Sequence, residues 1–179
     1  IVFLILATYT SSLLLRIDAI QQYVAVRVSE GIRNYGKLPL EIGSVRVRHL
    51  SKIEINDILL NDQLGDTMAS IKKLTLHVSP QRLLQEQIRV NTITLAKPDI
   101  RIYKESPDSC TNLQFIIDLF ASNDTTESII PDTRINQLQV YDGKVTYNVR
   151  SKERKGDRFD PNHIAIYDIN TNISLKKLT

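Results

Sequence analysis

The architecture of this chain is set by residues 40–60, which read LEIGSVRVRHLSKIEINDILL. From Val45 to Arg48, and again from Lys52 to Ile55, apolar and charged residues alternate one by one. A strand shows this period of two when it buries only one of its faces. Strands of a parallel sheet covered by helices on both sides would be apolar throughout. The segment therefore predicts two strands of a one-sided, antiparallel sheet.

The alternation slips by one residue at three places. The apolar positions change parity across residues 43–44 and 56–57, and again across residues 91–92. Such a slip would turn the apolar side chains outward unless the backbone compensates. A β-bulge compensates and increases the local twist, although a turn would also interrupt the pattern. Together the slips predict a sheet that curls.

The same alternation continues along the rest of the chain. It is found in residues 74–78, 88–90, 100–102 and 145–149. Few helical patterns lie between these stretches, so successive strands are expected to neighbour one another in a meander. We expect a mainly β domain over residues 40–179.

Helical patterns occur on either side of these strands. Residues 16–36 carry apolar side chains at spacings of three and four and end at Gly36, which predicts an amphipathic helix. Its apolar stripe could lie on a bilayer or pack on the body of the protein, and packing is the commoner arrangement. A short helix is expected near residues 112–121, with Asn112 as a possible cap. Residues 150–157 (RSKERKGD) predict a charged loop, for which a solvated hairpin tip is favoured over a binding patch.

The first fifteen residues, IVFLILATYTSSLLL, contain no charge. As a helix they would be about 22 Å long, so a few preceding apolar residues would complete a span of the ~30 Å hydrocarbon core. A signal-peptide core and a buried helix are the alternatives, but residues 16–20 show no cleavage site. We expect a single transmembrane helix over residues 1–15, truncated at its N-terminus. Its anchoring side chains are Ile1, Phe3, Leu4, Leu6, Leu13, Leu14 and Leu15.

No catalytic or metal-binding motif stands out. His49, His77 and His163 are isolated in sequence, and there is no G-x-S-x-G elbow, phosphate-binding glycine loop or HExxH motif. The single cysteine, Cys110, cannot form an intrachain disulfide. The net charge of +3 comes from dispersed basic residues, unlike the basic face of a nucleic-acid-binding module. We expect no enzymatic activity, no cofactor, no metal and no nucleic-acid partner.

Three aspartates lie in or beside turns. Asp57, Asp62 and Asp66 are placed where an aspartate usually accepts hydrogen bonds from its own backbone. Calcium binding is the alternative, but their spacing does not fit an EF-hand loop.

The one-sided sheet leaves an apolar face that must be covered. A second sheet could close it, because the few expected helices are too short to cover every strand. Otherwise the face stays partly open, and an exposed apolar face marks an interaction site. Both arrangements remain open from the residues alone.

Seven segments carry a resemblance to a known family, and their ordered succession matters more than any one of them. They are residues 16–23 (RIDAIQQY), 40–45 (LEIGSV), 53–58 (IEINDI), 62–68 (DQLGDTM), 74–79 (LTLHVS), 93–100 (ITLAKPDI) and 112–118 (NLQFIID). In this order, after an apolar stretch, they resemble the N-terminal portion of the AsmA/TamB family, particularly TamB-like proteins of the Bacteroides group. The resemblance covers about the first 120 residues.

The resemblance implies a location and a shape. Such proteins are held in the bacterial inner membrane by one N-terminal helix, and their β-sheet forms a U-shaped apolar groove through the periplasm. They are associated with phospholipid movement between the two membranes, and with assembly or secretion of outer-membrane proteins beside a BamA-like barrel. We expect this chain to hold the start of the groove and to lack the C-terminal part that would meet the barrel.

These expectations combine into a groove entrance for phospholipids. Acyl chains would lie against apolar side chains and be held by burial, at roughly 25 cal/mol per Å². The expected lining residues are Val45, Val47, Ile53, Ile55, Leu74, Leu76, Ile88 and Val90. A scaffold that receives outer-membrane strands by β-augmentation is the alternative function. A closed β-domain that serves only as a spacer is a third.

Overall fold

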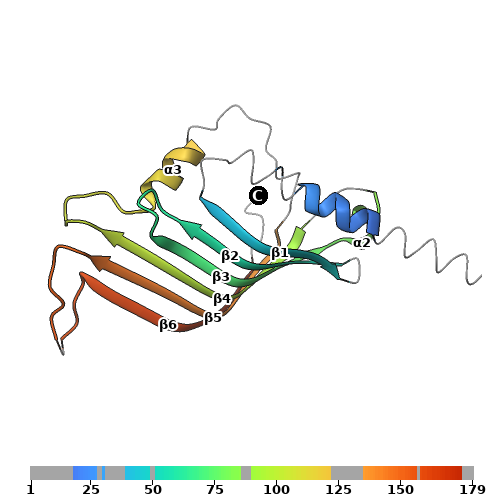
Figure 1. The fold of residues 1–179 in the computed structure, drawn as a ribbon. Coiled ribbons are helices and arrows are strands. Elements are labelled where there is room, and N and C mark those ends of the chain that lie inside the picture. The colour runs from blue at the N-terminus through green and yellow to red at the C-terminus, as the bar shows by residue number, and fades with distance from the viewer. Residues whose placement is uncertain are drawn as a thin grey trace, which may run out of the picture.

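The structure, a computed structural model, describes residues 18–27, 30, 39–48, 51–85, 90–121, 135–156 and 158–174. Its main feature is one sheet whose six strands lie in chain order (Figure 1). They are β1 (Leu40–Arg48), β2 (Lys52–Asn61), β3 (Thr67–Val78), β4 (Val90–Lys104), β5 (Gln137–Val149) and β6 (His163–Ser174). Two short helices, α2 (Pro80–Leu83) and α3 (Gln114–Ala121), lie between strands. The expected mainly β fold with few helices and neighbouring successive strands is confirmed.

The sheet is mixed, so the expectation of a wholly antiparallel sheet is wrong at one pair. β4 and β5 run parallel, whereas every other neighbouring pair is antiparallel. A parallel pair requires a crossover of a dozen or more residues. Residues 105–136, which include α3, connect these two strands. The alternation of side chains is the same in both kinds of pairing, which is why the pattern did not reveal the parallel pair.

The helix over residues 18–27 packs on one face of the sheet (Figure 1). Ile20 and Val24 are buried there in one cluster with Ile53, Ile55 and other strand residues. The apolar stripe of the expected amphipathic helix therefore faces the sheet within these residues. Burial of these side chains stabilises the fold, at roughly 1.5–3 kcal/mol for each large aliphatic residue.

The same helix covers the free edge of β1. The side-chain amide of Gln21 donates a hydrogen bond to the Val45 carbonyl (3.2 Å) and accepts one from the Val47 N–H (3.0 Å). A neighbouring strand would make the same pair of contacts with this edge. Gln21 thus satisfies backbone groups that would otherwise be free to pair with another chain.

The expected membrane helix over residues 1–15, with its anchoring side chains, lies outside the described residues, as do residues 31–36 of the expected amphipathic helix. Within the part of the chain that the structure describes, no helix is long and apolar enough to cross a bilayer.

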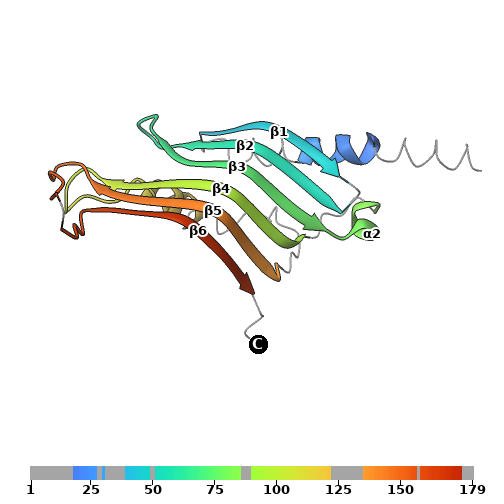
Figure 2. The ribbon, with the colours of Figure 1, turned by 90° about the horizontal axis from the view of Figure 1, so that it is seen from below.

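A row of irregular backbone positions crosses all six strands, and we name this row the crease. It passes through Gly43, Asp57, Lys72, Lys97, Asp142 and Asp168. The regular pairing of residues is interrupted along this row. Asp57, Lys97, Asp142 and Asp168 have φ angles of 52° to 55°. Figure 2 shows the strands bending partway along their length.

The crease explains two of the parity slips. Ile53 and Ile55 precede Asp57 and Ile58 follows it, and all three isoleucines are buried. The left-handed conformation of Asp57 lets the strand change parity while its apolar side chains stay on one face. The slips at residues 43–44 and 56–57 therefore lie inside strands and are not turns.

The third slip is a β-bulge in β4. His77 pairs with Thr92 and the next residue, Val78, pairs with Val90, which leaves Asn91 as an extra residue. Such a bulge adds twist at the strand end. All three slips therefore contribute to the curvature predicted from the sequence.

Candidate functional site

Paired residues place a continuous apolar surface on the helix-bearing face of the sheet, and we name it the apolar face. Directly paired residues on neighbouring strands point to the same side of a sheet. One row across the sheet is Val47, Ile53, Leu76, Ile93, Leu138 and Ile173. Beyond the crease a second row is Leu40, Leu60, Ala69, Ile100, Val145 and Ile166. The apolar face thus extends over all six strands and both sides of the crease.

Exposure of the apolar face is lowest on β2 and highest on β6. Ile53, beneath the helix over residues 18–27, is 1% exposed, whereas Ile173 and Ile166 on β6 are 44% and 52% exposed. The buried cluster draws its members from that helix and from β1 to β4. The apolar side chains of β5 and β6 lie outside this cluster. Apart from Val149, which is buried, they are half-buried or exposed and form the open part of the face.

The residues selected from the sequence as the groove lining lie mainly under the helix. Ile53, Ile55 and Val90 are buried in the cluster that includes Ile20 and Val24. Four further members are partly buried and pack against it, namely Val45, Val47, Leu74 and Leu76. Ile88 lies outside the described residues. The structure therefore brings seven of the eight together, and their described contacts include the chain's own helix.

The open part of the apolar face consists of residues that the sequence did not select. They are Leu138, Val140 and Val145 on β5, which are half-buried, and Ile166 and Ile173 on β6, which are exposed. A signal for them is present, because Leu138 and Val140 alternate with glutamines and Ile164 and Ile166 flank Ala165. The alternation does not show which strands lie far from the helix, because that distance depends on the order of the strands in the sheet.

The opposite face is polar. Each member of the first apolar row has a neighbour in its strand that points to this opposite face. These neighbours also pair across the sheet and are Arg46, Glu54, Thr75, Thr94, Gln139 and Asn172. Within it the Thr94 hydroxyl donates a hydrogen bond to the Gln139 side chain (3.1 Å). Neighbouring residues of one strand, such as Ile173 and Asn172, therefore sample two chemically different surfaces.

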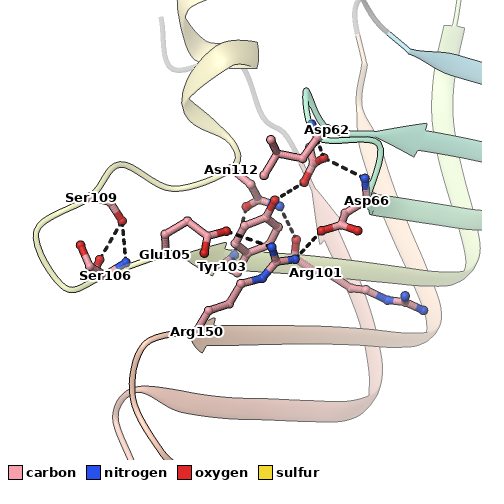
Figure 3. Close-up of polar contacts among 10 residues, drawn as sticks. Asp62, Asp66, Arg101, Tyr103, Glu105, Ser106, Ser109, Asn112 and Arg150 are labelled. Atoms are coloured by element: carbon pink, nitrogen blue, oxygen red, sulfur yellow. Dashed lines mark hydrogen bonds and ion pairs between the residues drawn. The ribbon is translucent and has the colours of Figure 1, made fainter.

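A polar cluster closes one end of the sheet (Figure 3). Asp62, in the β2–β3 turn, is 4% exposed and accepts hydrogen bonds from the N–H groups of Leu64 and Asp66, both at 2.9 Å. Its other carboxylate oxygen accepts a hydrogen bond from the Tyr103 hydroxyl. Burial, together with the hydrogen bond to Asp62, raises the pKa of Tyr103 to about 12. Asp62 thus bonds its own turn, as expected from the sequence, and also fixes the end of β4.

Arg150 joins three elements at this end. Its guanidinium pairs with Asp66 and with Glu105 (2.9 Å), and its central carbon lies 3.5 Å from the centre of the Tyr103 ring. A cation over an aromatic face contributes about 0.5–1 kcal/mol at an exposed site. The contacts hold the end of β5 against the β2–β3 turn, which is a structural role.

Asn112 does not act as the cap expected from the sequence. Its side-chain oxygen accepts a hydrogen bond from the Tyr103 N–H (3.0 Å), and its side-chain nitrogen donates one to the Arg101 carbonyl (2.9 Å). These backbone groups belong to β4, so the amide acts like a short piece of a neighbouring strand. The segment before α3 is thereby tied to the sheet.

A cavity of about 450 Å³ opens beside the polar cluster. Its lining includes Leu64 and Phe115, but also the carboxylates of Asp62, Glu105 and Asp118. Carboxylates in the lining disfavour a hydrocarbon occupant. An acyl chain is therefore better accommodated by the apolar face than by this cavity.

The described histidines, cysteine and carboxylates form no metal centre. No group of three His, Cys, Asp or Glu side chains in the described ranges is close enough to hold a metal ion. His163 contacts Asp160 (2.9 Å), and Cys110 is an exposed free thiol. Asp57 pairs with Lys72, its neighbour along the crease. These residues have structural partners or face solvent.

Comparison with known proteins adds no family. A scan against protein-family models and a search of the curated proteins both find no match. The likeness to the AsmA/TamB family therefore remains a prediction from the ordered sequence segments.

Proposed function

We propose that this chain forms the entrance of a groove that conducts phospholipids, with acyl chains lying on the open part of the apolar face. The observation that supports it is the exposure of apolar side chains on β6, at the edge of that face. The chain's own helix covers the part on β1 to β4, and Ile166 and Ile173 on β6 remain exposed. Interchangeable aliphatic side chains suit an acyl chain, because its burial requires no directional bond.

The proposal includes a location and partners. The uncharged residues 1–15 would anchor the chain in the bacterial inner membrane, and the sheet would stand in the periplasm. Phospholipids would enter from that membrane and move toward the outer membrane. A BamA-like barrel of the outer membrane is a further partner in this proposal.

A lysine at an exposed position of the apolar face tests this function. In Ile166→Lys, an ammonium would have to be buried beneath an acyl chain, which costs several kcal/mol when it is unpaired. We expect at least about tenfold less phospholipid to copurify, measured by mass spectrometry of extracted lipids. Ala165→Lys is the matched control, because Ala165 is an exposed neighbour on the polar face. Equal lipid content in the two variants would contradict the proposal.

A scaffold for outer-membrane protein assembly is the second candidate, and the two edges of the sheet favour it. Gln21 occupies the edge of β1, whereas β6 pairs only with β5 among the described strands. An open edge strand can receive an extended segment by β-augmentation. Hydrogen exchange distinguishes the two functions. A strand partner would protect backbone amides of β6, and an acyl chain would leave them unchanged.

A further inference from the structure

The described residues of the loop between β5 and β6, 150–156 and 158–162, project from the end of the sheet (Figures 1 and 2). Asp160 is 5% exposed and organises the loop. It accepts hydrogen bonds from the N–H groups of Lys155 and Asn162, both at 3.0 Å, and contacts His163 Nδ1 at 2.9 Å. The backbone N–H of Lys155, then that of Asn162 and then His163 lower the pKa of Asp160 to about 2. The carboxylate is therefore ionised at neutral pH, and the loop keeps this shape.

The residue before Asp160 points into solvent. Phe159 is 82% exposed, more than any other large apolar residue that the structure describes. A single exposed apolar residue is common on protein surfaces. Here, however, the bonds of Asp160 fix the backbone next to it, so the ring is presented by an ordered turn.

Basic residues lie close to Phe159 in the sequence. Lys152, Arg154, Lys155 and Arg158 are all exposed, and no described residue forms an ion pair with them. The loop sequence contains fewer acidic than basic residues, with Glu153, Asp157 and Asp160 as its acids. The carboxylate of Asp160 is already occupied by its own loop. The exposed charge of the loop is therefore mainly positive.

We infer that the β5–β6 loop docks on the headgroups of an anionic phospholipid surface, with Phe159 inserted at the headgroup boundary. Aromatic and basic side chains together give peripheral membrane binding, and each Lys or Arg near an anionic surface contributes about 1 kcal/mol. A protein partner would be expected to meet a wider apolar patch, whereas Phe159 is a lone ring among charges. Charge complementarity thus favours the lipid surface. The structure has residues 150–156 exposed between the antiparallel strands β5 and β6, as the expected solvated hairpin tip requires, and the inference adds a lipid surface as the partner of this tip.

The loop begins where β5 ends and ends where β6 begins, and β6 carries Ile166 of the open part of the apolar face. Headgroup binding by the loop would hold this end of the sheet near lipid. The inference nevertheless stands without the groove, because it depends only on the loop. Lipid copurification and loop insertion are separate measurements, so either proposal can fail alone.

The chain contains no tryptophan, so one introduced tryptophan reports on its own surroundings. The full chain carrying Phe159→Trp is reconstituted in bilayers, with or without phosphatidylglycerol. Phospholipids with brominated acyl chains are placed in the host bilayer or in vesicles added afterwards. We expect a blue shift and quenching that require phosphatidylglycerol and decrease at high salt. Quenching by brominated lipid in the host bilayer would show that the loop binds the membrane holding the protein. Quenching by brominated lipid in the added vesicles would show that it binds a second membrane.

Two further variants make the result decisive. Leu64→Trp is the control, because Leu64 is exposed in the β2–β3 turn and should show neither blue shift nor quenching. Adding Arg154→Gln and Arg158→Gln to Phe159→Trp should weaken the phosphatidylglycerol-dependent binding on the order of 30-fold, from two lost charges. If the Phe159→Trp spectrum matches that of Leu64→Trp in every membrane, the inference is overturned. A shift that appears only with an added protein would overturn it in favour of a protein partner.

Discussion

Single residues set the curvature of this sheet, and Gly43 is the clearest case. It faces Asp57 at the crease, and a Cβ at position 43 would lie 3.0 Å from the Asp57 Cβ and 3.2 Å from the Asn56 carbonyl oxygen. Both distances are shorter than normal contacts, and one partner is backbone. The absence of a side chain at Gly43 therefore permits the close approach of β1 and β2.

Gly43→Ala should destabilise the protein by about 1–3 kcal/mol, because the added methyl group has to displace β2. The measurement is the free energy of unfolding in urea. Gly156→Ala serves as the control, because a methyl group at position 156 would have no other atom within 4 Å, and its effect should stay within about 0.5 kcal/mol. Equal effects of the two substitutions would show that the approach at the crease is not tight.

Tyr103→Phe tests the polar cluster at the end of the sheet. Removal of the hydroxyl leaves the buried Asp62 carboxylate with one partner fewer, which should cost about 1–3 kcal/mol. The variant should also change the pH dependence of stability. The pKa of Tyr103 is raised from 10.0 to about 12, so between these values the folded protein retains a proton that the unfolded chain has released. This contribution is complete below pH 10 and is lost as the pH rises toward 12.

Urea unfolding at pH values below 10 and between 10 and 12 checks this prediction. The difference in stability between the wild type and Tyr103→Phe should be largest below pH 10 and should shrink as the pH rises. A difference that stays constant across this range would mean that Tyr103 does not hold its proton more tightly when folded.

At the scale of elements, the helix over residues 18–27 has two tasks. It covers part of the apolar face with Ile20 and Val24, and it closes the edge of β1 through Gln21. Both contacts come from two successive turns of the helix, so the helix determines which edge of the sheet is covered. The other edge, β6, has no such contact among the described residues.

Gln21→Ala should cost about 1–3 kcal/mol, since two hydrogen bonds to the backbone of β1 are lost. The amide of Val47 should then exchange faster with deuterium. Gln22→Ala is matched in chemistry and in element, but Gln22 is exposed, so both readouts should be unchanged. Unaltered exchange at Val47 in Gln21→Ala would show that the edge is protected by something else.

Alternation located the strands, and the parity slips located the crease on β1 and β2, because both patterns depend on neighbouring residues. The direction of β5 was missed because it depends on the long crossover after β4. The sequence also did not predict that Asp57, Lys97 and Asp142 lie in one row across the sheet. That row depends on the register between strands, which the pattern of a single strand does not contain.

The candidate site was predicted only in part. Alternation identified apolar side chains such as Ile53 and Leu76 as members of one face, and the structure places both there. It could not tell that the amphipathic helix would cover this part and leave Ile166 exposed, because that depends on where the helix packs.

At the scale of the whole molecule, the sheet combines a polar face, an apolar face and a bend. The helix packs on the apolar face in one cluster with residues of β1 to β4, and Ile166 and Ile173 on β6 are exposed. The crease keeps the apolar rows on one side although each strand changes parity there. An apolar surface that is both continuous and partly exposed is the feature on which the proposed function depends.

Photo-crosslinking from β6 tests this claim most directly. A photo-reactive phenylalanine analogue is placed at Ile173 or at Asn172, which are both exposed but lie on opposite faces of one strand. The protein is illuminated in membranes that contain phospholipid labelled in its acyl chain. We expect strong labelling from position 173 and little from position 172. Equal labelling from both positions, or none from position 173, would contradict an acyl-chain site on the apolar face.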